Sequence, residues 1–170
     1  MRVPEANAGD AAQDPIFGRE EYDRHATKVC VSRLLDSKDG FQVGDDINDK
    51  ASEDESGYSL ATTNDGMILA IGAKNNNGTG RGVGHVYVFA RDVATNHIQN
   101  GSDINVEAEF DESGYSLAIS TNGGIVAIGA TSNGVTGPGA VRMFVWDGVT
   151  NYVRRGLDIN GEAAYSFSGV

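Results

Sequence analysis

The stretch Ser56-Gly57-Tyr58-Ser59-Leu60-Ala61 occurs a second time as Ser113-Gly114-Tyr115-Ser116-Leu117-Ala118, 57 residues further along the chain. Between residues 46–73 and residues 103–130, 18 of 28 positions are identical. A period of this length is typical of blade and solenoid proteins, in which one unit cannot bury its own faces and must pack on its neighbours. The repeat therefore predicts the architecture and leaves the chemistry of the protein open.

The repeat extends to both sides of this stretch. Residues 86–103 correspond to residues 141–158 at a spacing of 55, because the intervening loop has lost two residues in the second copy. The chain then divides into an irregular lead or degraded half-blade, a partial blade, two full blades and the start of a truncated blade, at residues 1–26, 27–55, 56–112, 113–160 and 161–170. A closed propeller has about four to eight blades, so we expect either a fragment of a longer repeat protein or an assembly of several copies.

Each full unit is expected to form four short strands. Residues 67–73 and 125–130 are almost continuously apolar, as expected for central strands that are covered on both faces. A third strand rich in Val, Tyr and Phe follows in each unit, and a fourth is expected near His97 and near Tyr152. The predicted fold class is all-β, with β-propeller blades of four antiparallel strands that form an incomplete propeller of two full blades plus partial blades.

Turn residues and small residues support this interpretation. Asn64 to Gly66 and Thr121 to Gly124 predict hairpin turns, because Asn, Asp and Gly tolerate positive φ. The small pairs Gly72-Ala73 and Gly129-Ala130 suit a crowded position near a propeller axis, where larger side chains would clash.

Three short motifs of the unit are also characteristic of a known family. Gly57-Tyr58-Ser59-Leu60, followed by Leu69-Ala70-Ile71-Gly72-Ala73 and Gly84-His85-Val86-Tyr87-Val88, resembles the FG-GAP repeat. This repeat is the unit of the integrin alpha-chain β-propeller and occurs in many secreted repeat proteins. The resemblance covers residues 27–165, and it implies a binding or adhesion module that is extracellular or at the cell surface.

The sequence departs from the family pattern in two ways. Ser56 and Ser113 stand where the family has Phe, and Lys74 and Thr131 stand where it has Pro. The calcium loop of the family is also shortened.

The two shortened loops are Thr63-Asn64-Asp65-Gly66 and Ser120-Thr121-Asn122-Gly123-Gly124. They hold one carboxylate and none, whereas calcium prefers about six to eight oxygen ligands. We therefore expect no cofactor and no defined metal site, although weak, diffuse attraction of calcium to the acidic surface stays open.

Acidic residues are concentrated in two equivalent connections. The formal net charge is −11, and residues 44–55 hold six carboxylates while residues 101–112 hold five. Both segments link a fourth strand to the next first strand, on the side of the long loops 74–83 and 131–139. A surface of this sign attracts basic partners or cations and repels nucleic acid.

We define the acidic rim as Asp54, Glu55, Asp111 and Glu112, and we predict that it is a possible partner-binding surface. An acid/base pair is less favoured than solvated acidic loops, because these residues are adjacent in sequence and precede Ser-Gly. The alternative is that the charge only maintains solubility.

The inventory of catalytic residues is small. His25, His85 and His97 are the only histidines, and no HExxH, CxxC or Gly-x-Ser-x-Gly pattern occurs. Gly78 to Gly82 is interpreted as a plain loop between strands, because it lacks the Gly-Lys-Ser/Thr ending of a phosphate-binding loop. Cys30 is interpreted as a packing position, and one cysteine leaves the redox compartment undetermined. No apolar stretch reaches the length of a membrane span.

These observations favour a non-catalytic binding or adhesion module with an unknown protein or carbohydrate ligand and no nucleic-acid partner. One alternative is the propeller portion of a hydrolase-type enzyme whose active site lies outside this chain. Another is an incomplete, nonfunctional piece. Self-association is also expected, because open blade edges and uncovered apolar faces favour association.

Overall fold

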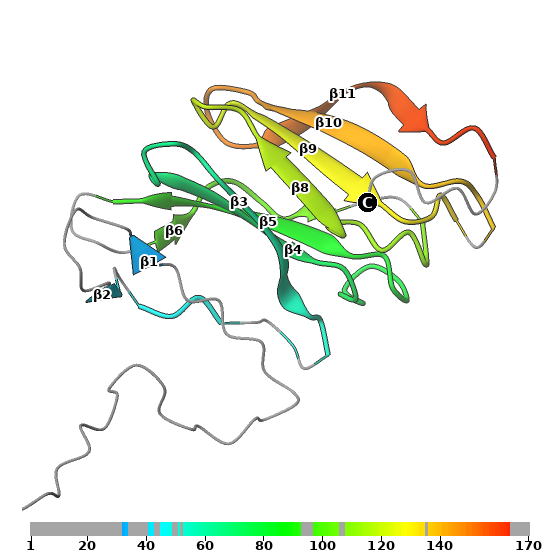
Figure 1. Cartoon of the computed structure of the whole chain (residues 1–170), viewed down its shortest axis with the longest axis horizontal. Coiled ribbons are helices and arrows are strands. Elements are labelled where there is room, and N and C mark those ends of the chain that lie inside the picture. Colours follow the sequence, from blue (N-terminus) through cyan, green and yellow to red (C-terminus); the bar gives the residue numbers. More distant parts are fainter. Residues whose placement is uncertain are drawn as a thin grey trace, which may run out of the picture.

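The computed structural model describes residues 32–33, 41–42, 45–48, 51, 53–92, 97–105, 108–134 and 136–163. These residues contain strands, turns and loops but no helix, which confirms the all-β prediction for them (Figure 1). The predicted lead at residues 1–26, with His25, lies outside the described residues, and so does Cys30.

Two antiparallel sheets correspond to the two predicted full blades. The first sheet has the order β3-β4-β5-β6 and the second has the order β8-β9-β10-β11. The strands of the first sheet are β3 (Ser56–Thr62), β4 (Ile68–Ala73), β5 (His85–Arg91) and β6 (His97–Gln99). Those of the second are β8 (Ser116–Ile119), β9 (Ile125–Ala130), β10 (Ala140–Trp146) and β11 (Tyr152–Asn160). Each sheet follows chain order, so every connection joins neighbouring strands.

The described residues also form smaller pairings. β1 (Ser32–Arg33) pairs with β2 (Phe41–Gln42) in a separate two-stranded sheet. β7 (Ile104–Asn105), which the sequence pattern did not predict, pairs with the beginning of β5, while β6 pairs with its end. In the second unit the single strand β11 makes both pairings with β10, across an irregularity in the register.

The predicted hairpin turns are confirmed. Gly66 N donates to Thr63 O at 2.8 Å, and Gly123 N donates to Ser120 O at 2.8 Å. The hydroxyl of Thr63 donates to Asp65 Oδ1 at 2.6 Å, and this hydrogen bond is the main cause of the lowered pKa of Asp65. Asn122 accepts from the hydroxyl of Ser120 at 2.8 Å in the same way. Both side chains therefore stabilise their own turns.

The main core lies between the two sheets, which pack against each other in Figure 1. Its buried residues are Ala70, Val86, Val88 and Ile104 from the first unit and Val126, Ile128, Phe144 and Tyr152 from the second. On the far face of the first sheet, Leu69 and Ile71 pack with Phe89 and with Ile47 from the preceding segment. The first sheet is thus covered on both faces, as its continuous apolar sequence requires.

The two units approach each other closely at small residues. A Cβ atom on Gly72 would lie 2.2 Å from the carbonyl oxygen of Gly114, and the hydroxyl of Ser59 donates to that oxygen at 2.6 Å. A Cβ atom on Gly84, which has a φ of +77°, would lie 2.2 Å from Ser113 O. The prediction that Gly72 occupies a crowded position is confirmed.

Backbone hydrogen bonds tie the long loop of the first unit to the start of the second. The carbonyl oxygens of residues 81–83 accept hydrogen bonds at 2.9 to 3.0 Å from the N–H groups of Phe110, Glu112 and Ser113. Asn76 O likewise accepts from Gly84 N at 3.1 Å within the loop. This network places the loop beside the acidic connection, on the side of the molecule that the sequence predicted.

Candidate functional site

The acidic connections turn their aspartates inward. Glu53 and Glu55 have φ values of +72° and +54°, and the equivalent Phe110 and Glu112 have values of +65° and +53°. A residue other than glycine rarely adopts this left-handed conformation, and here two flank each aspartate. The enclosed residues Asp54 and Asp111 are 2% and 0% exposed.

The prediction of a solvated acidic rim is therefore corrected at its two aspartates. Their backbone turns bury the carboxylates beneath the loops, where they cannot contribute to an exposed charged surface. Glu55 forms an ion pair with Lys74 at 3.0 Å, and the equivalent Glu112 accepts from the hydroxyl of Thr131 at 2.7 Å. Of the four acidic residues, the two aspartates are therefore buried and structural, whereas the two glutamates are half-buried and have partners of their own.

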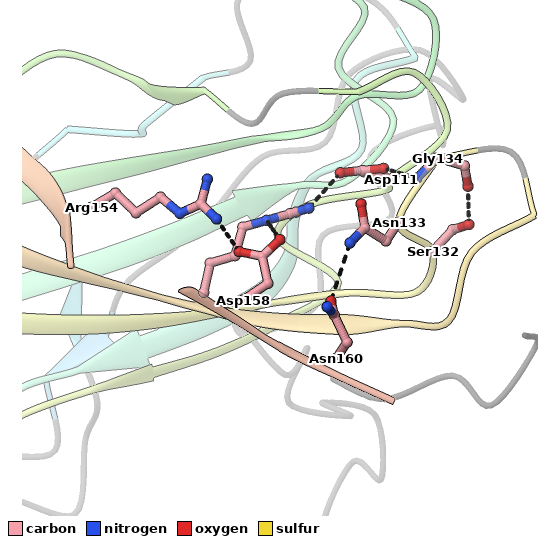
Figure 2. Close-up of polar contacts among 8 residues, drawn as sticks. Asp111, Ser132, Asn133, Gly134, Arg154, Asp158 and Asn160 are labelled. Carbon is pink, nitrogen blue, oxygen red and sulfur yellow. Dashed lines mark hydrogen bonds and ion pairs between the residues drawn. The ribbon is translucent and has the colours of Figure 1, made fainter. Parts of the chain in front are cut away.

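Asp111 belongs to an ion-pair network that we call the second corner, formed by Asp111, Arg142, Asp158 and Gly134. Arg142, 2% exposed, donates from Nη2 to Asp111 at 2.9 Å and from Nε to Asp158 at 3.0 Å. The N–H of Gly134 donates to the other oxygen of Asp111 at 2.6 Å. Figure 2 shows Asp111 and Asp158 in this network, with Arg154 also donating to Asp158. The corner is closed because one arginine side chain occupies its interior.

The equivalent first corner consists of Asp54, Asn76, Tyr87 and Asp103, together with His85. Asn76 Nδ2 donates to Asp54 Oδ2 at 2.6 Å and to the hydroxyl oxygen of Tyr87 at 3.1 Å. His85 Nδ1 lies 3.9 Å from Asp103 Oδ2, and the rings of His85 and Tyr87 meet edge to face at 6.2 Å. These residues line a cavity of about 420 Å³.

Repeat spacing relates the two corners residue by residue. Asp54 corresponds to Asp111 at the spacing of 57, whereas Tyr87 corresponds to Arg142 and Asp103 to Asp158 at the spacing of 55. The equivalent backbone contacts are also kept, since Asp54 O accepts from Asn75 N at 3.2 Å and Asp111 O accepts from Ser132 N at 3.4 Å. On the third strand, Arg142 replaces Tyr87 and Ala140 replaces His85. The equivalent asparagines also differ, since Asn76 donates to Asp54 whereas Asn133 donates to Asn160.

Burial dominates the electrostatics of Asp54. Removal of its carboxylate from water raises its pKa, and the hydrogen bond from Asn76 and the proximity of His85 partly oppose this effect. The described lining of the cavity contains Asp54 and Asp103 but no lysine or arginine. It also contains no Ser, Thr or Cys side chain that could act as a nucleophile. Hydrogen-bonded recognition of a ligand is the chemistry that this set of groups supports best.

Metal binding receives no support from the described part of the chain. No group of three or more His, Cys, Asp or Glu side chains is arranged there to hold a metal ion. His97 lies on β6, away from the lining of the first corner, and burial lowers its pKa.

Four members of the first corner were not predicted as site residues: Asn76, His85, Tyr87 and Asp103. A signal was present in Arg142, a charged residue within the otherwise apolar strand Ala140–Trp146, because a buried arginine needs acidic partners. Aligning the two repeats would then have shown that both units have the two aspartates, and that Tyr87 stands in the first unit where Arg142 stands in the second.

Comparisons with known proteins leave the family open. No protein-family model matches this chain, and no curated protein is significantly similar to it. The described residues include no helix that is long and apolar enough to cross a membrane.

Proposed function

We propose that this chain is a non-catalytic binding module built of FG-GAP-like β-propeller repeats, and that the cavity at the first corner receives its ligand. One observation carries the proposal: residues of the first corner line a cavity of about 420 Å³, whereas the second corner is bridged by the buried guanidinium of Arg142. A cavity of this size fits a side chain or a single sugar of a larger partner.

The surroundings of the cavity suit binding. Asn76 Oδ1 accepts from the N–H of Gly78 at 2.8 Å, and its amide nitrogen donates to Asp54, so the loop and the carboxylate are held together. The backbone bonds of residues 81–83 to the second unit hold the far end of the same loop. Such a preorganised lining reduces the entropy that is lost when a ligand binds.

A panel of small probes tests this function by NMR on the full chain. We would titrate butylguanidinium, butyrate and methyl glucoside at millimolar concentrations and follow the amide signals of Asn76, Asn77 and Gly78. At least one probe is expected to shift these signals more than those of the second corner.

Paired variants at the repeat-equivalent alanines control for indirect effects. Ala51→Trp places a large side chain in the lining of the cavity and should abolish the shifts. Ala108→Trp makes the same change beside the second corner and should leave them in place. If no probe in the panel shifts the loop signals, the proposed function is wrong.

A further inference from the structure

We propose that Asn77 is an acceptor for an N-linked glycan. This inference goes beyond the proposed function and does not depend on it, because the modification requires an exposed asparagine rather than a cavity.

The acceptor pattern for N-glycosylation occurs twice in the chain. It is Asn-x-Ser/Thr, in which x is any residue except Pro. The two occurrences are Asn77-Gly78-Thr79 and Asn100-Gly101-Ser102. A pattern of three residues is short, so the surroundings of each asparagine decide which of the two can carry a glycan.

Asn77 lies on the surface of the loop between β4 and β5. All three residues of its pattern are exposed, and none of them belongs to a strand. A glycan is bulky and hydrophilic, so the residue that carries it must face water in the folded chain. The first occurrence meets this requirement along its whole length.

The amide nitrogen of Asn77 is the atom that would be modified, and the loop leaves it accessible. Asn77 Oδ1 accepts from the N–H of Gly82 at 2.8 Å, which identifies this atom as the oxygen and holds the side chain in place. Within the part of the chain that the structure describes, Asn77 Nδ2 donates to no other group. The neighbouring Asn76 differs, because it is 5% exposed and donates from Nδ2 to Asp54 and Tyr87. A glycan on Asn77 would thus leave the hydrogen bonds of the loop intact.

The surroundings of Asn100 are unsuitable for a glycan. Burial raises the pKa of Tyr152, and a hydrogen bond with the Asn100 side chain partly opposes this shift. A Cβ atom on Gly101 would lie 3.0 Å from Thr150 O. The second occurrence therefore lies against the second unit, where a glycan would have to separate the two units.

The transfer joins Asn77 to a polyprenyl-diphosphate oligosaccharide, which is the donor substrate of an oligosaccharyl transferase. A bond forms between Nδ2 of Asn77 and the anomeric carbon of the sugar, and the bond from that carbon to the diphosphate oxygen breaks. The polyprenyl diphosphate leaves, and one amide proton passes to a base of the enzyme. No oxidant or reductant takes part.

Expression of the full chain behind a cleavable signal peptide, in the secretory pathway of a eukaryotic cell, tests the inference. Peptide mass spectrometry is expected to find a glycan on Asn77. A peptide-N-glycosidase should remove it and convert Asn77 to a heavy-oxygen-labelled aspartate when the digestion is done in heavy-oxygen water. Cleavage of the signal peptide identifies the copies that reached the lumen, and only these copies are counted.

A set of variants locates the acceptor. Asn77→Gln and Thr79→Ala should both remove the glycan, whereas Thr79→Ser should keep it because the hydroxyl of the pattern is retained. Asn64→Gln changes an exposed turn residue outside the pattern, and Asn100→Gln removes the second occurrence. Both of these changes should leave the glycan in place.

Two results would overturn the inference. One is an unmodified Asn77 in chains whose signal peptide has been cleaved, whether or not those chains fold, since the whole luminal fraction is analysed. The other is a glycan that persists in Asn77→Gln and disappears in Asn100→Gln, because the acceptor would then be Asn100. Neither result bears on ligand binding at the cavity, which the probe titration of the unglycosylated chain decides.

Discussion

The two corners share a backbone and differ in what occupies them. The second corner holds a buried arginine between two aspartates, whereas the first corner places Tyr87 at that position and encloses a cavity. Arg142 pairs with both aspartates in the second unit, whereas in the first unit Asn76 donates to Asp54 and to the hydroxyl oxygen of Tyr87. Different side chains on equivalent strands thus give a buried ion-pair network at the second corner and a cavity at the first.

The largest effect is expected for Arg142→Met. This change leaves Asp111 and Asp158 without their shared cation in a buried setting, and we expect a loss of about 4 kcal/mol in the free energy of unfolding. Tyr87→Met at the first corner removes a ring but no charge and should cost about 2 kcal/mol. Urea unfolding of both variants gives the comparison, and equal losses would remove the distinction between the corners.

The aspartates give the next comparison. Asp111→Asn breaks a buried ion pair with Arg142 and is expected to cost about 3 kcal/mol. Asp54→Asn keeps an oxygen that can accept from Asn76 and should change stability by less than about 1 kcal/mol. A larger loss at Asp54 would show that the first corner depends on its charge.

The pH dependence of Asp54→Asn sharpens this test. Burial raises the pKa of Asp54 in the folded chain, so the folded state takes up a proton before the unfolded state does. The stability of the wild-type chain relative to Asp54→Asn should therefore rise as the pH falls from neutral through the raised pKa toward the unfolded value of 3.8. Unfolding curves across this range would contradict the assignment if the difference moved in the opposite direction.

A third comparison concerns the apolar faces of the two sheets. Ile68 packs against the core between the sheets, while the equivalent Ile125 is 40% exposed on the outer face of the second sheet. Val145 pairs with Ile125 and with Val153, which is 42% exposed, so these side chains share that face. Ile68→Ala should cost about 2 kcal/mol and Ile125→Ala less than about 1 kcal/mol, as measured by urea unfolding. Similar losses would mean that the outer face is also covered.

The same face is the predicted route of self-association. Light scattering of the full chain should detect oligomers, and Ile125→Lys should reduce them because it charges the exposed apolar surface. A variant that folds and associates as strongly as the wild type would place the contact elsewhere.

The smallest effects are expected for Glu55→Gln and Glu112→Gln. Glu55 is 45% exposed in its ion pair with Lys74, and such pairs contribute less than about 0.5 kcal/mol. Glu112 accepts from the neutral hydroxyl of Thr131, which a glutamine oxygen can also do, so its replacement should be equally mild. Urea unfolding of both variants measures these losses, and surface changes typically stay below about 0.5 kcal/mol. A loss above about 1 kcal/mol would mean that the replaced glutamate has a structural role like that of Asp111.

The repeating part of the fold could be predicted because its signals are local. Apolar runs predicted the central strands, and Asn64 to Gly66 predicted a turn that forms as expected. The direction of Asp54 could not be predicted, because it depends on left-handed backbone at Glu53 and Glu55, two residues of a type that rarely adopts it. The cavity could not be predicted either. It depends on which side chains meet in three dimensions around Tyr87, and local sequence patterns do not show this.

The unequal size of the residues between the two sheets has a consequence for larger assemblies. At one end of the strands Gly72 meets the backbone of Gly114, while toward the other end Ile68, Ile119, Trp146 and Tyr152 fill the space between the sheets. Small residues at one edge and large ones at the other make the interface a wedge. Any further units stacked through the same wedge would turn by a constant angle, so the array would curve. Enlarging Gly72 should open that angle, and the curvature of the array would change before its strand pairing did.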